Sequence, residues 1–410
     1  MNTGGTRRAF QKIGEDLRFL AGCLPHRVAR TEEEAEAAEY IESRLRDILG
    51  PEGVESEAFE APENAMLLRG SIMLEFVVVS LIATWWPLAG AAYGAVVALV
   101  LTLDLLGFPI MERLVPSFTS RNIVGACPGV SPREMLVFTA HYDSGMVTPM
   151  QRLAETVGTR KLYLLVVGLA VQVVGACLVE GILKYHGLES PPLVAYRWAA
   201  TWGLLGAGIL HFLSGRGEPS RGANYNASGV AALLALAERL HERPLWHYDV
   251  FVVFPGAHRE NMAGLRTFLA RCGPMKAILR LIHVEGVGMG TPAYATEEGE
   301  FTRRADSELV AVARTISDTF GAVPVQLHRP AGAWCAIGRG YPAITITSAD
   351  SMGRPGAPAA RDDSLASVSE ERTFDAARFI EAMARELDNL ACPADATGDH
   401  DPGDTDANHA

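Results

Sequence analysis

The chain has 410 residues, of which 49% are hydrophobic, so it can form one large domain or two medium ones with a substantial core. Its formal net charge of −12 argues against a nucleic-acid-binding protein, which would present a basic face. Part of the acidity lies in residues 391–410, where aspartates stand among small and polar residues with almost nothing apolar to bury. We expect this acidic tail to be disordered.

The first predicted element is a helix over residues 31–49. Thr31 followed by Glu34 predicts a capping box at its start, and glutamates fill its first turn. Gly50 and Pro51 end the helix. Residues 54–59 then alternate apolar and polar side chains like a short strand.

Four long apolar runs follow along the chain, joined by short turns into two hairpins. They cover residues 72–88, 91–110, 162–183 and 194–213, and each approaches the roughly 20 residues that span a bilayer as a helix. The charges inside them are Glu75, Asp104, Glu180 and Arg197. We expect four transmembrane helices in which Arg197 pairs with Glu180 or Asp104. The alternative is that the runs are buried helices of a soluble protein or a hydrophobic dimer face.

Flanking charges predict the orientation of these helices. Glu15, Asp16 and Arg18 stand where a secretory signal would be apolar, so no cleaved signal is expected. Most flanking Arg and Lys residues lie on the side of the termini, whereas the opposite turns carry only Lys184. We expect an integral protein of a bacterial-type inner or plasma membrane, with its soluble part and both termini cytoplasmic. The expected partners are the lipid bilayer and a protein partner or further copy bound through the hairpins, and no nucleic acid.

The remaining sequence alternates predicted strands and helices. A buried strand over residues 135–139 is followed by His141 and Asp143, at the edge where ligands collect in open α/β sheets. Further strands are expected over 248–254, 277–284 and 343–347, and helices over 226–240, 261–270, 307–320 and 370–387. This alternation predicts an α/β fold with a mostly parallel sheet covered on both faces.

Six separated segments carry a recognisable pattern. They are Thr139-Ala-His-Tyr-Asp-Ser144, Gly222-Ala-Asn-Tyr-Asn-Ala-Ser-Gly-Val-Ala-Ala-Leu-Leu234, Phe251-Val-Val-Phe-Pro-Gly256, His283-Val-Glu-Gly-Val-Gly288, Gly340-Tyr-Pro-Ala-Ile344 and Asp363-Ser-Leu365. In this order they resemble the zinc aminopeptidases of metallopeptidase family 28, which includes aminopeptidase Y, bacterial leucyl aminopeptidases and glutaminyl cyclases. The transferrin receptor and nicalin are relatives without peptidase activity. The resemblance implies a three-layer α/β sandwich around a mixed, mostly parallel sheet. The two apolar helical hairpins expected from the long apolar runs would be inserted into this fold.

Active members of this family hold two zinc ions that activate a bridging water. By resemblance, His141 matches the first histidine ligand, Asp143 the carboxylate behind it, and Glu285 an Asp/Glu ligand. Tyr225 stands where the bridging aspartate is expected. A phenol does not replace a carboxylate between two cations at neutral pH.

Two further positions of the dizinc pattern are also lost. His258 and Arg259 stand where a Glu-Glu pair would supply the general base and a ligand, and Arg259 adds a permanent positive charge. The distal histidine would lie about four residues before Asp363, near Ala359, yet residues 355–360 contain no histidine. We therefore expect a degraded dizinc site.

Three alternatives remain for the residues that are left. His141, His258 and Glu285 are a ligand set for one zinc ion. His258, or Glu260 after a small shift in register, would be the base of an active enzyme. Alternatively, Arg259 pairs with Glu285 or Asp143 and replaces the metal by a salt bridge, which we favour because unpaired buried carboxylates are costly.

These observations predict a membrane-anchored pseudopeptidase that serves binding or scaffolding and carries no cofactor. One alternative is a divergent metallo-aminopeptidase with one zinc ion, and another is a subunit of a membrane complex whose hairpins carry the function. The expected layout is a peptidase-like domain over 1–70, 114–160 and 215–390, hairpins over 71–113 and 161–214, and the acidic tail over 391–410.

Overall fold

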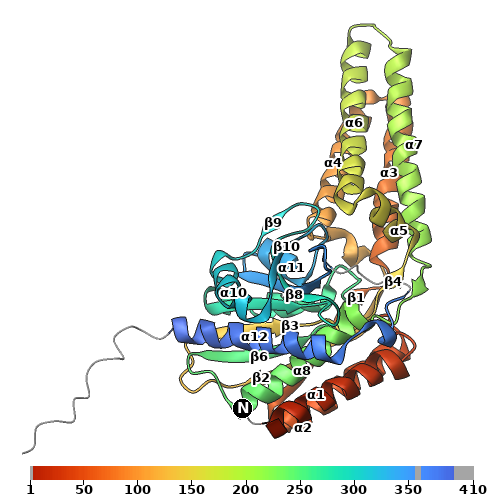
Figure 1. Cartoon of the computed structure of the whole chain (residues 1–410). Coiled ribbons are helices and arrows are strands. Elements are labelled where there is room, and N and C mark those ends of the chain that lie inside the picture. Colours follow the sequence, from red (N-terminus) through yellow and green to blue (C-terminus); the bar gives the residue numbers. More distant parts are fainter. Residues whose placement is uncertain (1–2, 356–361, 392–410) are drawn as a thin grey trace, which may run out of the picture.

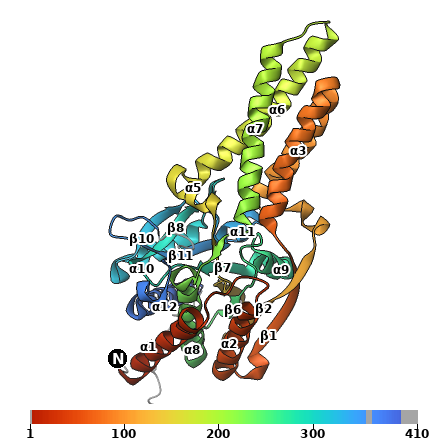
Figure 2. The same ribbon diagram turned by 90° about the vertical axis from the view of Figure 1, so that its right-hand side faces the viewer.

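The computed structural model describes residues 3–355 and 362–391. An α/β part built on one large sheet carries a bundle of four long helices that projects from one side of it (Figure 1). The same arrangement appears after a quarter turn, where α3, α6 and α7 rise together from the sheet-containing part (Figure 2). The acidic tail from residue 392 onward and the region around Ala359 lie outside the described residues.

The main sheet has nine strands in the order β1-β2-β6-β3-β7-β11-β8-β10, with β9 paired to β8. The four central strands β6, β3, β7 and β11 run parallel, whereas β2 and β8 join them antiparallel. Its strands are β1 (Val54–Pro62), β2 (Ser117–Cys127), β3 (Glu134–Thr139), β6 (Tyr248–Phe254), β7 (Leu279–Val284), β8 (Thr291–Glu298), β9 (Arg303–Arg304), β10 (Val323–Leu327) and β11 (Ala343–Ala349). A separate two-stranded sheet pairs β4 (Met146–Val147) with β5 (Glu218–Pro219). The predicted mixed, mostly parallel sheet is confirmed.

Helices cover both faces of this sheet. Successive residues of a strand point to opposite sides, so each buried strand packs against helices on both faces. On β3, Leu136 and Phe138 pack with α1, α2, α8 and α12, whereas Met135 and Val137 pack with α9 and α11. The helices of the α/β part are α1 (Thr3–Leu17), α2 (Glu32–Leu49), α8 (Ser228–Glu242), α9 (Ala263–Arg271), α10 (Ser307–Phe320), α11 (Gly332–Gly338) and α12 (Glu370–Leu390). This double covering makes the central strands apolar on both sides, as the sequence predicts.

Helix α2 begins with the expected capping interaction. The Thr31 side chain accepts a hydrogen bond from the Glu34 backbone N–H at 3.3 Å. The Glu34 carboxylate accepts from the backbone N–H of Arg30 at 2.7 Å rather than from Thr31. The capping threonine is therefore confirmed, and the glutamate reaches one residue further back than in a standard capping box.

The bundle consists of α3 (Ala65–Trp85), α4 (Pro87–Leu105), α6 (Thr159–Tyr185) and α7 (Pro191–Ser214), preceded by the short α5 (Pro149–Val157). By length and composition, all four long helices are able to cross a membrane. Helix α3 begins before the change of composition at Ser71, because Asn64 caps it by accepting from the Leu67 N–H at 3.0 Å. Many large apolar side chains of the bundle are exposed, including Val96, Leu165 and Val171. Such a continuous apolar surface is uncommon on a soluble monomer.

Close packing and ion pairs hold the bundle together. Helices α3 and α7 approach each other where a Cβ on Gly70 would lie 3.0 Å from the Gly208 carbonyl oxygen, so small residues permit the contact. Arg197 on α7 donates to Glu180 on α6 at 2.9 Å. Asp104 instead pairs with Arg69, at 2.6 Å. Of the two partners expected for Arg197, the structure thus selects Glu180.

Candidate metal centre

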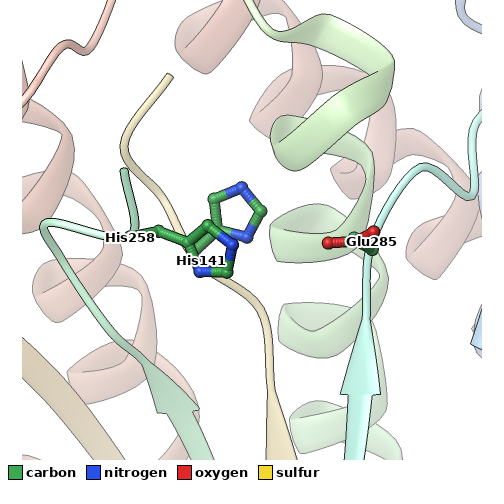
Figure 3. Close-up of side chains that lie close together, drawn as sticks. All are labelled: His141, His258 and Glu285. Atoms are coloured by element: carbon green, nitrogen blue, oxygen red, sulfur yellow. The ribbon is translucent and has the colours of Figure 1, made fainter. Parts of the chain in front are cut away.

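Three ligand-type side chains converge at the carboxyl ends of three parallel strands. His141 follows β3, His258 follows β6 and Glu285 follows β7. One ligand atom of each lies within 4.8 Å of the other two (Figure 3). The sequence places these residues at strand ends, and the structure brings them together at one edge of the sheet.

The two histidines stack and lack polar partners. Their ring centroids lie 3.8 Å apart with an interplanar angle of 13°. Both ring nitrogens of His141, and Nδ1 of His258, are buried without a hydrogen-bond partner. Burial lowers the pKa of His141 well below its usual value and that of His258 to about 3, and each imidazole disfavours a charge on its neighbours. The pair is therefore neutral at physiological pH, the form in which imidazole binds a metal.

Glu285 is the fully buried anion of the site, and its ion-pair partner is Arg329. The Arg329 guanidinium lies 2.5 Å from the carboxylate, and His283 Nε2 lies 3.3 Å from it. Burial alone would raise the pKa of Glu285, but Arg329 and His283 outweigh burial and hold the pKa at about 2. Glu285 is thus ionised, and an internal cation already balances it.

Asp143 and Arg259 do not form the expected salt bridge. The Asp143 carboxylate accepts the backbone N–H groups of His258 and Arg259 at 2.9–3.3 Å, so it holds the turn after β6. The Arg259 side chain donates to the Ser214 carbonyl at 2.9 Å and contacts the Met146 sulfur. The prediction that the Arg259 side chain pairs with Glu285 or Asp143 is wrong. Arg329, which follows β10, pairs with Glu285, and Asp143 accepts backbone N–H groups.

Tyr225 lies beside the histidines. Its ring meets His141 edge-on at a centroid distance of 4.9 Å, and the central carbon of the Arg329 guanidinium lies 5.6 Å from the centroid of the Tyr225 ring. Asp363 fixes this segment by accepting the backbone N–H of Asn224 and of Tyr225 at 2.6 and 3.0 Å. Burial raises the pKa of the Tyr225 phenol, so a neutral hydroxyl group lies beside His141 at physiological pH.

Glu260, the alternative base, faces another part of the molecule. Its carboxylate accepts the backbone N–H of Ala65 at 2.6 Å, at the first residue of α3. It is not among the described residues that line the cavity beside His141 and His258. This interaction links the α/β part to the bundle instead of presenting a base to the site.

The donors present fit one metal ion and do not fit two. The unpartnered nitrogens of His141 and His258, with Glu285, supply two imidazoles and one carboxylate, a set suited to zinc. A tetrahedral zinc site brings its donors to about 3.3 Å from one another, so small side-chain shifts are needed. Tyr225 and Arg259, which also line this end of the site, offer a neutral phenol and a cation, and neither group balances the charge of a second ion.

A cavity of about 690 Å³ adjoins the stacked histidines. His141, Asp143, Tyr225, His258 and Arg259 form its polar end. Its remaining walls come from α5, the first turns of α3 and α6, β4, β10 with the two residues that follow it, and residues 353–355. The site therefore lies between the α/β part and the helical bundle.

Sequence reasoning missed Arg329 and the role of His283. Arg329 follows the carboxyl end of β10, in a stretch to which no strand had been assigned, although Val323-Pro-Val-Gln-Leu327 alternates in the manner of a strand. His283 and Glu285 are two residues apart, so their side chains fall on the same side of the extended chain. That spacing was the available signal for a contact between them.

Comparisons with known proteins agree with this architecture. Residues 207–333, which include Tyr225, His258, Glu285 and Arg329, match the family model described as Peptidase family M28. This part of the chain is similar to peptidase family M28. The expected resemblance to this family is thereby confirmed, while no curated protein matches the chain's sequence.

Solved structures of such enzymes share the fold. A glutaminyl cyclase from an Acidobacteriales bacterium superposes with a TM-score of 0.53 and 12% identity, over 94% of this chain and 95% of that chain. The aminopeptidase of Aneurinibacillus sp. strain AM-1 gives 0.53 and 13%, over 92% and 94%. BSAP, a zinc aminopeptidase from Bacillus subtilis, gives 0.53 and 14%, over 93% and 95%. At these identities the likeness establishes the aminopeptidase-like fold alone.

Next to the site, Glu298 predicts a pH dependence of stability. This fully buried carboxylate accepts the Trp334 backbone N–H at 2.9 Å, yet burial raises its pKa to about 7. Since an unfolded glutamate titrates near 4.3, only the native state holds this proton between about pH 4 and 7, so stability falls across this range and levels off above about pH 7. We expect Glu298→Gln to match the parent at pH 5 and to exceed its unfolding free energy by about 2 kcal/mol at pH 8. Denaturation at both pH values measures this, and equal gains at both would contradict it.

Proposed function

We propose that this chain is a membrane-anchored protein whose aminopeptidase-like domain serves binding or scaffolding and carries no dizinc peptidase centre. The observation that carries the proposal is the ion pair between Arg329 and Glu285. It supplies, from within the chain, the positive charge that a metal ion would bring to this carboxylate. Arginine stays protonated at physiological pH, so this cation is permanent.

The positions around this ion pair support the same function. Tyr225 offers a neutral phenol, and His258 and Arg259 replace carboxylates that a metal pair requires. Two metal ions close together need a bridging anion to offset their mutual repulsion. The domain keeps the fold and the enclosed cavity of a peptidase without the groups that would activate water between two ions.

The anchoring part of the proposal is supported by the bundle. Four helices have the length and composition to cross a bilayer, and their outward side chains are apolar. The exposed Trp85, Trp86 and Tyr185 lie at the bundle's far ends, as interfacial aromatic residues do. With two hairpins and the charge pattern of the flanks, the α/β part and both termini lie in the cytoplasm, and a protein partner or second copy binds through the hairpins.

Metal content and peptidase activity test the proposal. We expect detergent-purified protein, after dialysis against a weak chelator, to contain no stoichiometric zinc by elemental analysis and to leave aminoacyl-anilides uncleaved. The Bacillus subtilis zinc aminopeptidase, treated in parallel, is the positive control. Two zinc ions per chain together with cleavage would refute the proposal.

A single-metal hydrolase is the second candidate, favoured by the unpartnered nitrogens of His141 and His258. One zinc ion on these residues and Glu285 would act as a Lewis acid and lower the pKa of a bound water. This candidate predicts one ion per chain and its loss, together with any activity, in His141→Ala. Metal content that is unchanged in this variant would exclude it.

A further inference from the structure

The geometry points to a ligand for the cavity beside the stacked histidines: a single-chain amphiphile drawn from the membrane, with its anionic headgroup at Arg259 and its acyl chain between α5 and β10. The inference rests on the proposed binding function. A cavity that holds an acyl chain would not be free to accept a peptide substrate. A carboxylate and a phosphate share the required headgroup chemistry.

The walls of the cavity suit an acyl chain. Met150 and Ala154 of α5, Leu162 of α6, and Val325 and Leu327 of β10 line it. Its volume of about 690 Å³ falls in the range of roughly 300–1,000 Å³ in which proteins enclose drug-sized ligands.

The polar end of the cavity suits an anion. The described lining of the whole cavity contains three arginines, of which Arg329 pairs with Glu285 and Arg354 pairs with Asp350. The third is Arg259, and the lining carboxylate, that of Asp143, accepts backbone N–H groups. Arg259 is partly buried there. Glu260 and Asp143 attract its charge, but the printed hydrogen-bond partners of its side chain among the described residues are the Ser214 carbonyl and the Met146 sulfur. A carbonyl and a thioether are weak partners for a guanidinium, whereas an anionic headgroup would form charge-assisted hydrogen bonds.

His141 adds a second donor at the same end. It is fully buried, it lines the cavity, and neither of its ring nitrogens has a partner. A buried polar atom without a partner destabilises the folded state. A headgroup oxygen beside Arg259 would satisfy the imidazole N–H and the guanidinium together.

The position of the cavity explains how a membrane amphiphile would reach it. It lies where α3 and α6 leave the α/β part, and α5 packs beside this end of the bundle in both views (Figures 1 and 2). Exposed apolar side chains occur on the segments at this end, namely Leu153 and Val157 of α5 and Ile110 and Leu114 after α4. Such side chains are buried when a segment lies at a bilayer surface. The cavity therefore sits at the level of the lipid headgroups.

Binding to the full chain in nanodiscs tests this inference, with oleate and oleoyl-lysophosphatidylglycerol as anionic probes and oleyl alcohol as the neutral probe. We expect one saturable site for at least one anionic probe. Arg259→Gln should weaken that binding by about tenfold or more, as the loss of a charge-assisted hydrogen bond implies, without changing the partitioning of oleyl alcohol. Ala154→Trp should abolish the saturable binding by filling the cavity.

Matched variants outside the cavity separate this site from nonspecific attraction. Arg160→Gln removes an exposed cation at the start of α6, and Thr156→Trp adds a large side chain to the exposed side of α5. Both should bind like the parent, and a thermal melt of each variant confirms folding. A preference for oleate identifies a fatty carboxylate as the ligand, and a preference for the lysophospholipid identifies a phosphate. Nonsaturable uptake, or equal affinity of Arg259→Gln and Arg160→Gln, would overturn the inference, whereas zinc content and peptidase activity decide the proposed function separately.

Discussion

Replacement of Arg329 by methionine is expected to lower the free energy of unfolding by about 3–5 kcal/mol. Glu285 is fully buried and its pKa is about 2, so the carboxylate stays ionised at pH 7 in the folded state. Methionine keeps most of the apolar stem of Arg329 but removes the guanidinium that lies 2.5 Å from this carboxylate. Denaturation of the detergent-solubilised protein at pH 7 measures the loss.

Two further variants make this result specific. Arg329→Met combined with Glu285→Gln should recover most of the lost stability, because no unpaired charge then remains. Arg18→Met, which breaks an exposed pair with Glu370 at 3.0 Å, should cost less than about 1 kcal/mol. A cost for Arg329→Met as small as that for Arg18→Met would mean that another cation, such as a bound metal ion, balances Glu285.

The sequence correctly predicted those elements whose structure is determined by the pattern of neighbouring residues. The strand Tyr248–Phe254 and the helix Ser307–Phe320 have the expected bounds, because a buried apolar run and a capped amphipathic pattern are readable from neighbouring residues. The strand Val323–Leu327 was missed. It contains Pro324, lies at the edge of the sheet and pairs with one neighbour, so few of its residues carry a strong strand preference.

The candidate site likewise contains residues whose positions the sequence indicates and residues whose positions depend on contacts between distant segments. The convergence of His141, His258 and Glu285 follows from their places after parallel strands, which the sequence order and the family resemblance both indicate. Arg329 was not predictable because its approach to Glu285 depends on the pairing of β10 with β8, a contact between distant segments. The orientation of Glu260 toward α3 likewise depends on where the bundle docks.

Replacement of Arg197 by methionine is expected to destabilise the helical bundle by about 3 kcal/mol or more. Arg197 is fully buried between α6, α7 and α3, where it donates to Glu180 at 2.9 Å and to the Ser80 carbonyl at 2.5 Å. Its removal leaves Glu180 without a cation in surroundings where a lone charge is costly. Thermal unfolding in detergent, followed by fluorescence of the bundle's tryptophans, measures the effect.

The double variant Arg197→Met with Glu180→Met separates the cost of an unpaired charge from the value of the pair. Replacing a whole buried ion pair by apolar residues is often neutral or stabilising, so this protein should unfold near the parent temperature or above it. Glu75→Gln, at a partly exposed position that accepts from the Tyr93 hydroxyl at 2.7 Å, should change stability little. If Arg197→Met alone matched the parent, the ion pair would be energetically unimportant. If instead the single variant is destabilised and the double variant is not, the ion pair fixes the register of α6 against α7 rather than adding net stability.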